Sequence, residues 1–504
     1  MGGEVETRRV RRRDRPEFAV VALAFLVVIV AASAIGSHYV PGAARSQAAR
    51  SGASPSADPH VVRWFVSLEA QTPEMLAAEQ TFAERFNSTN TDGTVLVVEA
   101  LPPGSSQADA LDRLSLETAV GDAPDIVGPV TQGSLYGLGG SLLDLGPQIE
   151  SHNLDLTMYD PPLVTALQMP ARLGFSAQAQ VGIPYAVDPG FLFYNKDLFQ
   201  AAGLPPLPTK VGDTYMGKNW DWDELAAVAA QLTRDTAGRT AMDPDFGSDP
   251  IDQFGIDFPG VDARTMASTF GSGSFVASDG LTIQVPSVWA DGLSWYYNAM
   301  WASHIAPPET YADGIATTFS AATSISSGFL AMALSFPSKI PTYTAGGKAS
   351  FIGWGMAVLP SWRGVTTSPE ELSTFSILSA STNQSRAFSA MLAIEADSPL
   401  RETFGGMPAN PSLRAAWFAA KERDLALIFP GNEVDWSVLE TMDSHRADPS
   451  PAADLPNYTA SVGDISDWFE NLRSNSTADM NTELAKLLTI LQIDANESGT
   501  QLNQ

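Results

Sequence analysis

Residues 61–130 alternate between apolar runs typical of strands and amphipathic runs typical of helices, and this alternation constrains the fold most strongly. Three short apolar runs predict strands, at residues 61–66, 94–101 and 124–130. Two intervening segments predict helices. The first starts at Thr72-Pro73, since proline suits the first helical position, and the second spans 106–120. Strand, helix, strand, helix, strand predicts a parallel sheet with helices on both faces.

The loops at one edge of this predicted sheet are the first candidates for a binding site. Parallel α/β sheets bind ligands at the carboxyl ends of their strands, so the loops after Val66 and Val127 are expected to line a cleft. Ser67 and Glu69 follow the first strand, and Thr131 follows the third. We therefore expect these three side chains to face a ligand.

The N-terminal segment predicts export or a membrane anchor. Residues 18–35 carry no charge, and as a helix they would be about 27 Å long, close to the hydrocarbon thickness of a bilayer. Six arginines precede this run and place the N-terminus in the cytoplasm. Ala32-Ser33-Ala34 also fits a signal-peptide cleavage site, so two alternatives stay open. The expected order is a basic cytoplasmic segment at 1–17, an anchor or signal peptide at 18–36, and a flexible linker at 37–60.

Charge and cysteine content narrow the class of ligand. The formal net charge is −28, and the residues after the first fifty carry about −32. Such a body repels nucleic acid and anionic membranes, and it favours a neutral or cationic small ligand. The chain has no cysteine, which excludes disulfides, thiolate metal sites, a cysteine nucleophile and a lipidated N-terminal cysteine.

A second informative segment, "IPYAVDPGFLFYNKDLFQAAGLPPLPT", begins at residue 183. Tyr185 and Asp188 stand directly before the apolar run "FLFY", and a short predicted helix follows it. Further along, "NWDWDELAAVAAQLTRDTAG" (219–238) predicts another helix, with Asp221 as its cap and Glu224 completing a capping box.

These segments, taken in order, resemble the extracellular solute-binding proteins of ATP-driven importers, and the sugar-binding, maltose-binding-protein-like members above all. "GDAPDIV" (121–127), "SGFLAMALSFP" (327–337), "WGMAVLP" (354–360) and "GGMPANPSLRAAW" (405–417) carry the rest of the resemblance. It covers roughly residues 60 to 490, and it is more specific for the family than for the ligand.

The resemblance implies a two-lobed α/β periplasmic-binding-protein-like fold. Each lobe would be a mostly parallel sheet with flanking helices, and crossing strands would form the hinge. The implied first lobe is 61–185 and 316–375, and the second is 186–315 and 376–504. Tyr185 and Asp188 would then lie at the floor of the cleft, where the chain crosses between the lobes.

The resemblance also implies further site residues. In maltose-binding relatives a carboxylate at the place of Asp188 accepts hydrogen bonds from sugar hydroxyls, which suits the strength of charged acceptors. Phe336 and Ser338 lie in "SFPSK", where relatives often carry "GPW", so this chain has serine at the place of the tryptophan. Phe375 and Ser376 stand where relatives often have a Gly-Gly pair.

The function implied is capture of a small solute, most simply a sugar, for delivery to the transmembrane subunits of an ABC permease. No cofactor is expected. Two alternatives stay open: an extracellular carbohydrate-acting enzyme, which needs only two carboxylates, and a ligand-presenting sensor component. The acidic loop at 243–253 spaces its acids like a calcium loop but lacks the glutamate at the twelfth position, so a calcium ion there stays undecided.

Overall fold

The computed structural model describes most of the chain from residue 60 onward. The described residues are 60–69, 71–170, 175, 178–277, 282–308, 328–340, 353–448, 450–452, 455 and 457–501. The predicted cytoplasmic segment, the apolar run and all but the last residue of the linker lie outside them. None of the helices in these ranges combines the length and the apolar character that crossing a bilayer requires.

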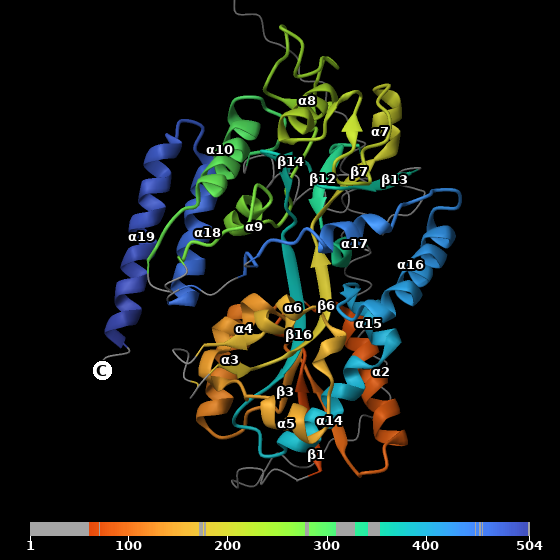
Figure 1. The fold of residues 1–504 in the computed structure, drawn as a ribbon, viewed down its shortest axis with the longest axis vertical. Coiled ribbons are helices and arrows are strands. Elements are labelled where there is room, and N and C mark those ends of the chain that lie inside the picture. The colour runs from red at the N-terminus through yellow and green to blue at the C-terminus, as the bar shows by residue number, and fades with distance from the viewer. Residues whose placement is uncertain are drawn as a thin grey trace, which may run out of the picture. The chain divides into compact units, whose positions relative to one another are not determined.

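The larger sheet has six strands in the order β17-β6-β16-β3-β1-β2 (Figure 1). Its strands are β1 (Val61–Phe65), β2 (Val95–Glu99), β3 (Ile126–Thr131), β6 (Ile183–Pro189), β16 (Glu370–Ile377) and β17 (Met407–Pro408). β1 runs parallel to β2 and β3, as the alternation of strands and helices predicted. β16 runs antiparallel to β3 and β6, and β17 runs antiparallel to β6. The sheet is therefore mixed rather than mostly parallel, because its other half is not built from strand–helix–strand units.

Helices cover both faces of this sheet, which confirms the predicted layering. On one face Trp64 packs in a core cluster with Phe82 and Phe388, and on the other Phe65 packs with Leu114. Neighbouring residues of β1 thus serve opposite faces, as the alternation of side chains along a strand requires. The helices on these faces are α2 (Pro73–Thr89), α14 (Gln384–Glu395), α3 (Gln107–Ala119) and α4 (Gln132–Leu138).

Helix starts follow the predicted caps, with one difference. The side chain of Thr72 caps α2, and Asp221 caps α8 (Trp222–Leu232) by accepting a hydrogen bond of 2.9 Å from the Glu224 amide. The Glu224 carboxylate, however, pairs with the Lys218 ammonium at 2.7 Å. Only half of the predicted capping box forms, because a nearby lysine supplies a charged partner for this carboxylate.

A second sheet of three antiparallel strands lies in the other part of the described structure (Figure 1). Its central strand is β7 (Phe191–Asn195), with β12 (Met332–Ser335) and β13 (Trp354–Ala357) on its two sides. All five residues of β7 are buried, which confirms the buried strand predicted at "FLFY". The predicted helix after it is α7 (Lys196–Ala201), which Asn195 caps. This sheet, too, differs from the mostly parallel one expected.

One glycine joins the two sheets. Gly190 stands between β6 of the larger sheet and β7 of the smaller one, and its amide donates a 2.7 Å hydrogen bond to the Pro369 carbonyl. A Cβ atom at Gly190 would lie 2.7 Å from Cγ of Pro369, so glycine is required by this close approach. β16 begins beside it, and β6 and β16 run together from one sheet toward the other (Figure 1).

The C-terminal third of the chain contributes to both parts. α14 and α15 (Ser398–Phe404) follow the boundary expected at residue 376, and yet α14 packs on β1 and β16 while α15 packs on α2. α18 (Tyr458–Ser474) contacts α10 (Ser287–Trp301), α9 (Ala263–Ser268), α4 and α19 (Met480–Gln501). The division into two lobes with the stated boundaries stays a prediction.

Shorter elements complete the described chain. The remaining helices are α5 (Gly146–Ser151), α6 (Pro161–Ala166), α16 (Arg414–Ile428) and α17 (Ser437–Asp443), with 3₁₀ turns η1 (Gly139–Ser141), η2 (Leu156–Met158), η4 (Pro337–Lys339) and η6 (Pro411–Leu413). The remaining strands are β4 (Gln168–Met169), β5 (Ala179–Gln180), β8 (Thr214–Tyr215), β9 (Lys218–Asn219), β10 (Arg234–Asp235), β11 (Ile251–Gln253), β14 (Ser361–Trp362) and β15 (Val365–Thr366).

Candidate functional site

A cavity of about 170 Å³ opens where the two crossing strands leave the larger sheet, and we call it the inner chamber. The ends of β1 and β3 reach it, as the rule for parallel strands predicts. β6, β16, the end of α15 and η4 supply its other walls. Its lining residues are Val66, Glu69, Gln71, Met75, Pro129, Thr131, Tyr185, Ala186, Asp188, Ser338, Lys339, Glu371, Ser373, Phe404 and Gly406.

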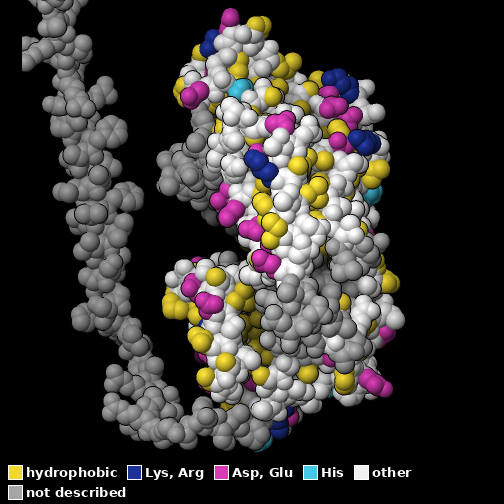
Figure 2. All heavy atoms as spheres, turned by 90° about the vertical axis from the view of Figure 1, so that its left-hand side faces the viewer, with side chains coloured by type: hydrophobic (Ala, Val, Ile, Leu, Met, Phe, Trp, Pro, Cys, Tyr) yellow, Lys and Arg dark blue, Asp and Glu magenta, His cyan; other side chains and the backbone are white. Residues whose placement is uncertain are grey.

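A second cavity of about 380 Å³ adjoins it, and we call this the outer chamber. The two chambers share four lining residues: Glu69, Thr131, Lys339 and Glu371. Residues of α3, α4, α9 and α18 supply much of the remaining lining, among them Gln107, Ser134, Asp262, Arg264 and Tyr458. The surface view shows a hollow on one face of the molecule with acidic side chains beside it (Figure 2).

Asp188 lies in the wall of the inner chamber and is 7% exposed. Its Oδ1 accepts a 3.0 Å hydrogen bond from the Ser338 amide, which ties β6 to η4. The Ser338 side chain forms a further hydrogen bond with this carboxylate. Burial raises the pKa of Asp188, and the hydrogen bonds with Ser338 oppose that rise. A carboxylate offers about four acceptor sites, so Asp188 can still accept a hydrogen bond from a ligand.

Glu371 stands directly opposite Asp188 in the pairing of β16 with β6. Its side chain is accessible to water within the chambers, although the residues on either side of it along β16 are buried. Desolvation, followed by the nearby charge of Asp188, raises the pKa of Glu371 to about 7. Two carboxyl groups thus meet at the point where the strands cross, and both face the inner chamber.

Glu69 and Thr131 meet as the sequence predicted. The Glu69 carboxylate accepts 3.0 Å hydrogen bonds from both the amide and the hydroxyl of Thr131, and a further one from the Ser134 hydroxyl. Thr131 also caps α4. Glu69 therefore fixes the loop after β1 against the start of α4, and it lines both chambers at the same time.

The structure brings five of the nine predicted residues into the inner chamber, and places four outside both chambers. The five are Glu69, Thr131, Tyr185, Asp188 and Ser338. The Ser67 hydroxyl accepts a 2.9 Å hydrogen bond from the Leu101 amide, and Phe336 is buried in the core. Phe375 is also fully buried, and the Ser376 hydroxyl donates a 2.7 Å hydrogen bond to the Val181 carbonyl.

The alternation of side chains along β16 explains why Phe375 lies in the core and not in the inner chamber. Glu371, Ser373 and Phe375 alternate along β16, so they share one face of the strand. The first two line the inner chamber, whereas Phe375 lies further along, where its ring packs 5.0 Å from Tyr185 and 6.1 Å from Trp64 between ring centroids. The core of the larger sheet therefore begins where the chamber ends.

The residues that sequence reasoning missed are Gln71, Lys339, Glu371, Asp262 and Arg264. Lys339 directly follows the predicted Ser338, so the sequence alone could have indicated that it lies in the same turn. Glu371 was not, because its place opposite Asp188 depends on an antiparallel pairing between distant segments.

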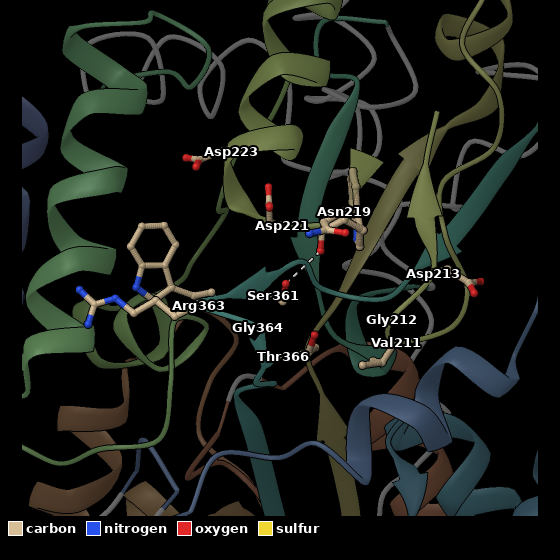
Figure 3. Close-up of a pocket in the computed structure, with 12 residues that line it drawn as sticks. Val211, Gly212, Asp213, Asn219, Asp221, Asp223, Ser361, Arg363, Gly364 and Thr366 are labelled. Atoms are coloured by element: carbon tan, nitrogen blue, oxygen red, sulfur yellow. Dashed lines mark hydrogen bonds between the residues drawn. The ribbon is translucent and has the colours of Figure 1, made fainter. Parts of the chain in front are cut away.

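A larger cavity of about 540 Å³ lies elsewhere, between the β8–β9 hairpin, the start of α8 and the β14–β15 hairpin (Figure 3). It contains none of the predicted site residues. Arg363 at its edge is engaged in an ion pair of 2.7 Å with Asp291, and the Ser361 hydroxyl donates to the Trp220 carbonyl at 3.3 Å. Because its polar groups do not converge on one point in Figure 3, we assign no role to this cavity.

Metal-ligating side chains do not gather in the part of the chain that the structure describes. No group of three or more His, Asp or Glu residues there could hold a metal ion. In the acidic loop at 243–253, the Asp243 carboxylate accepts a 2.9 Å hydrogen bond from the Asp245 amide.

A comparison with protein families identifies the family of the chain that forms the two chambers. The model of the bacterial extracellular solute-binding proteins matches residues 69–393, which is more than half of the chain. The chain belongs to this family. Proteins of this family are extracellular or periplasmic, and they bind solutes for ABC importers. They are not enzymes. The alternative of a carbohydrate-acting enzyme is therefore wrong.

Solved structures of solute-binding proteins show the same fold. The Lmo0181 protein of Listeria monocytogenes, in complex with cycloalternan, has a TM-score of 0.62 at 15% identity and covers 88% of this chain and 99% of its own. MalE of Xanthomonas citri gives 0.62 at 16% identity, with 88% and 99% covered. UgpB of Mycobacterium tuberculosis, in complex with glycerophosphocholine, gives 0.61 at 18% identity, with 86% and 98% covered. A comparison with curated protein sequences gave no match.

The titration of Glu371 predicts how solute binding responds to pH. With a pKa of about 7, Glu371 is a charged acceptor at pH 8 and is mostly protonated at pH 6. If the solute needs the charged form, its dissociation constant should rise about tenfold between pH 8 and pH 6. The groups facing Glu371 are Asp188, Lys339, Glu69 and Asp262.

Calorimetric titration between pH 6 and pH 8 measures this change in affinity, and the variant Glu371→Gln should bind with an affinity that no longer depends on pH in this range. A parent protein with constant affinity would contradict the expectation.

Proposed function

We propose that this solute-binding protein captures a carbohydrate in the inner and outer chambers and delivers it to the transmembrane subunits of its permease. The observation that carries this proposal is the pair of facing carboxyl groups, Asp188 and Glu371, in a cavity that the aromatic residues Tyr185 and Phe404 also line. Carboxylates accept strong hydrogen bonds from hydroxyl groups, and an aromatic ring offers apolar area to the C–H face of a sugar.

The ligands of similar structures support a carbohydrate solute. One neighbour was solved in complex with cycloalternan, another with mannotriose bound, and a third with maltotriose bound. Their identities to this chain are 15–16%, so their ligands support the class of solute and not one sugar.

We also propose that the two sheets belong to two lobes that close on the solute. The expected lobes are 61–185 with 316–375, and 186–315 with 376–504, except that α14 and α15 pack with the larger sheet and its helices. Gly190, at the junction of β6 and β7, is a natural place for the hinge, because only a glycine fits against Pro369 there. Closure of two domains around a ligand is a known type of motion.

A solute screen followed by scattering tests this proposed function. Thermal-shift measurements against mono-, di- and trisaccharides should identify at least one compound that raises the melting temperature, since a ligand that binds only the folded state stabilises it. Small-angle scattering at saturation should then show a smaller radius of gyration than the free protein. A saturating sugar that leaves the radius unchanged would argue against closure.

The N-terminal run at 18–36 is proposed to stay in place as a membrane anchor. Its support is an uncharged length that matches a bilayer, six preceding arginines and the lack of a cysteine for lipidation. N-terminal sequencing of the protein isolated from membranes should find the segment intact. A mature chain beginning close to residue 35 would show instead that the segment is a cleaved signal peptide.

A further inference from the structure

The acidic groups of the inner chamber outnumber the cationic ones in the described lining. Asp188, Glu371 and Glu69 all line it, and none of them forms an ion pair with another described residue. Lys339 is the one cationic side chain in the described lining, and no ion pair joins it to any of the three acids. Three carboxyl groups thus share a cavity of about 170 Å³ with a single lysine.

One deeply buried carboxylate in the chamber wall has unused hydrogen-bonding capacity. Asp188 is 7% exposed, and its hydrogen bonds are with Ser338. An ionised carboxylate offers about four acceptor sites, so Asp188 can still accept a hydrogen bond from a ligand in the chamber. The hydroxyl of Tyr185, in contrast, is fully buried and interacts with Arg401 outside the chamber.

The electrostatics favour a positively charged ligand group over a neutral one. Carboxylates that share a site repel one another, and the repulsion is relieved either by protonation or by a cation. Desolvation, and after it the charge of Asp188, raises the pKa of Glu371 to about 7, which favours protonation in the free protein. A bound cation would provide the second, and the net charge of −28 would draw it toward the protein.

We propose that the solute carries a positively charged nitrogen, as a protonated amine or a quaternary ammonium group, which binds between Asp188 and Glu371. This rests on the proposed solute-binding role of the chambers, and it names the chemical class of the solute. A protonated amine would donate to the carboxylates of Asp188 and Glu371. A quaternary ammonium group would sit between the same carboxylates and meet the aromatic ring of Phe404, which also lines the chamber.

Matched pairs of compounds test the proposal by calorimetric titration at pH 7.5 and low salt. The amine pairs are glucosamine with glucose, and the β-1,4 disaccharide of glucosamine with cellobiose. The ammonium pair is choline with 3,3-dimethylbutan-1-ol, which has the same shape and no charge. In at least one pair the cation should bind at least tenfold more tightly than its neutral mate. The pair that responds distinguishes an amine from a quaternary ammonium group.

Variants separate a local effect from a general effect of charge. Glu371→Gln should weaken binding of the preferred cation at least tenfold and binding of its neutral mate less than threefold. Asp223→Asn removes an exposed carboxylate beside the 540 Å³ cavity of Figure 3, and it should leave both affinities unchanged. Asp188→Asn serves as the second test if Glu371→Gln fails to fold, as judged by its melting curve.

The possible outcomes distinguish this inference from the proposed function. Neutral sugars that bind as tightly as their cationic mates, or more tightly, would overturn the cationic solute and leave the sugar-binding function in place. Equal losses for the cation and its neutral mate in Glu371→Gln would also overturn it. A protein that binds no member of any pair, and no sugar in the wider screen, would refute both.

Discussion

Asp188→Ala is expected to weaken solute binding by about 10- to 100-fold. The carboxylate lies in the wall of the inner chamber, and besides its hydrogen bonds with Ser338 it has acceptor sites left for a solute. A hydrogen bond to a charged acceptor contributes roughly 1.5–3 kcal/mol, and each 1.4 kcal/mol corresponds to a factor of ten in affinity. Calorimetric titration with the solute found in the screen measures the loss.

Two companion variants sharpen this prediction. Asp188→Asn keeps one acceptor oxygen for the Ser338 amide, so it should lose less affinity than the alanine variant. Ser67→Ala should bind like the parent protein, because the Ser67 hydroxyl accepts from the Leu101 amide and lies outside both chambers. If Asp188→Ala binds normally, the carboxylate serves only to hold η4 against β6, and our assignment of the site is wrong.

Local signals made the first half of the larger sheet predictable. The apolar runs of β1, β2 and β3 and the caps Thr72 and Asp221 depend on residues close together in sequence, and each is found where it was expected. The antiparallel half was not predictable in this way. β16 pairs with β3 and β6 from a distant part of the chain, and neither hydrophobic pattern nor turn chemistry encodes such a partner.

The residues of the candidate site also fall into those that the sequence could predict and those that it could not. Glu69 and Thr131 follow predicted parallel strands, and a rule about strand ends was enough to bring them together. Asp188, Tyr185 and Ser338 came from the resemblance to solute-binding proteins, and they line the same chamber. Glu371 needed the register of β16 against β6, which only the structure supplies. Phe375 and Ser376 also came from the resemblance, but both are fully buried in the larger sheet, because this chain has larger side chains than the Gly-Gly pair of its relatives at these positions.

Arg414→Leu is expected to produce the largest loss of stability among these variants, about 3–5 kcal/mol in the free energy of unfolding. The Arg414 guanidinium is 5% exposed, pairs with the 4% exposed Asp443 at 2.7 Å and donates a 3.0 Å hydrogen bond to the Pro408 carbonyl. It thereby ties α16 to α17 and β17. Leucine would leave Asp443 buried with only Arg446 as a charged partner, together with an unpaired carbonyl.

A surface pair of the same length provides the matched control. Arg363 pairs with Asp291 at 2.7 Å, and the Arg363 side chain is 61% exposed. Water and salt screen an exposed pair, so Arg363→Leu should cost no more than about 1 kcal/mol. Thermal and urea unfolding of both variants compare a buried with an exposed ion pair at equal distance, and the loss for Arg414→Leu also includes its hydrogen bond to Pro408. Equal losses in the two variants would show that the buried pair contributes no more than a surface one, and that the contact of α16 with α17 depends on apolar packing alone.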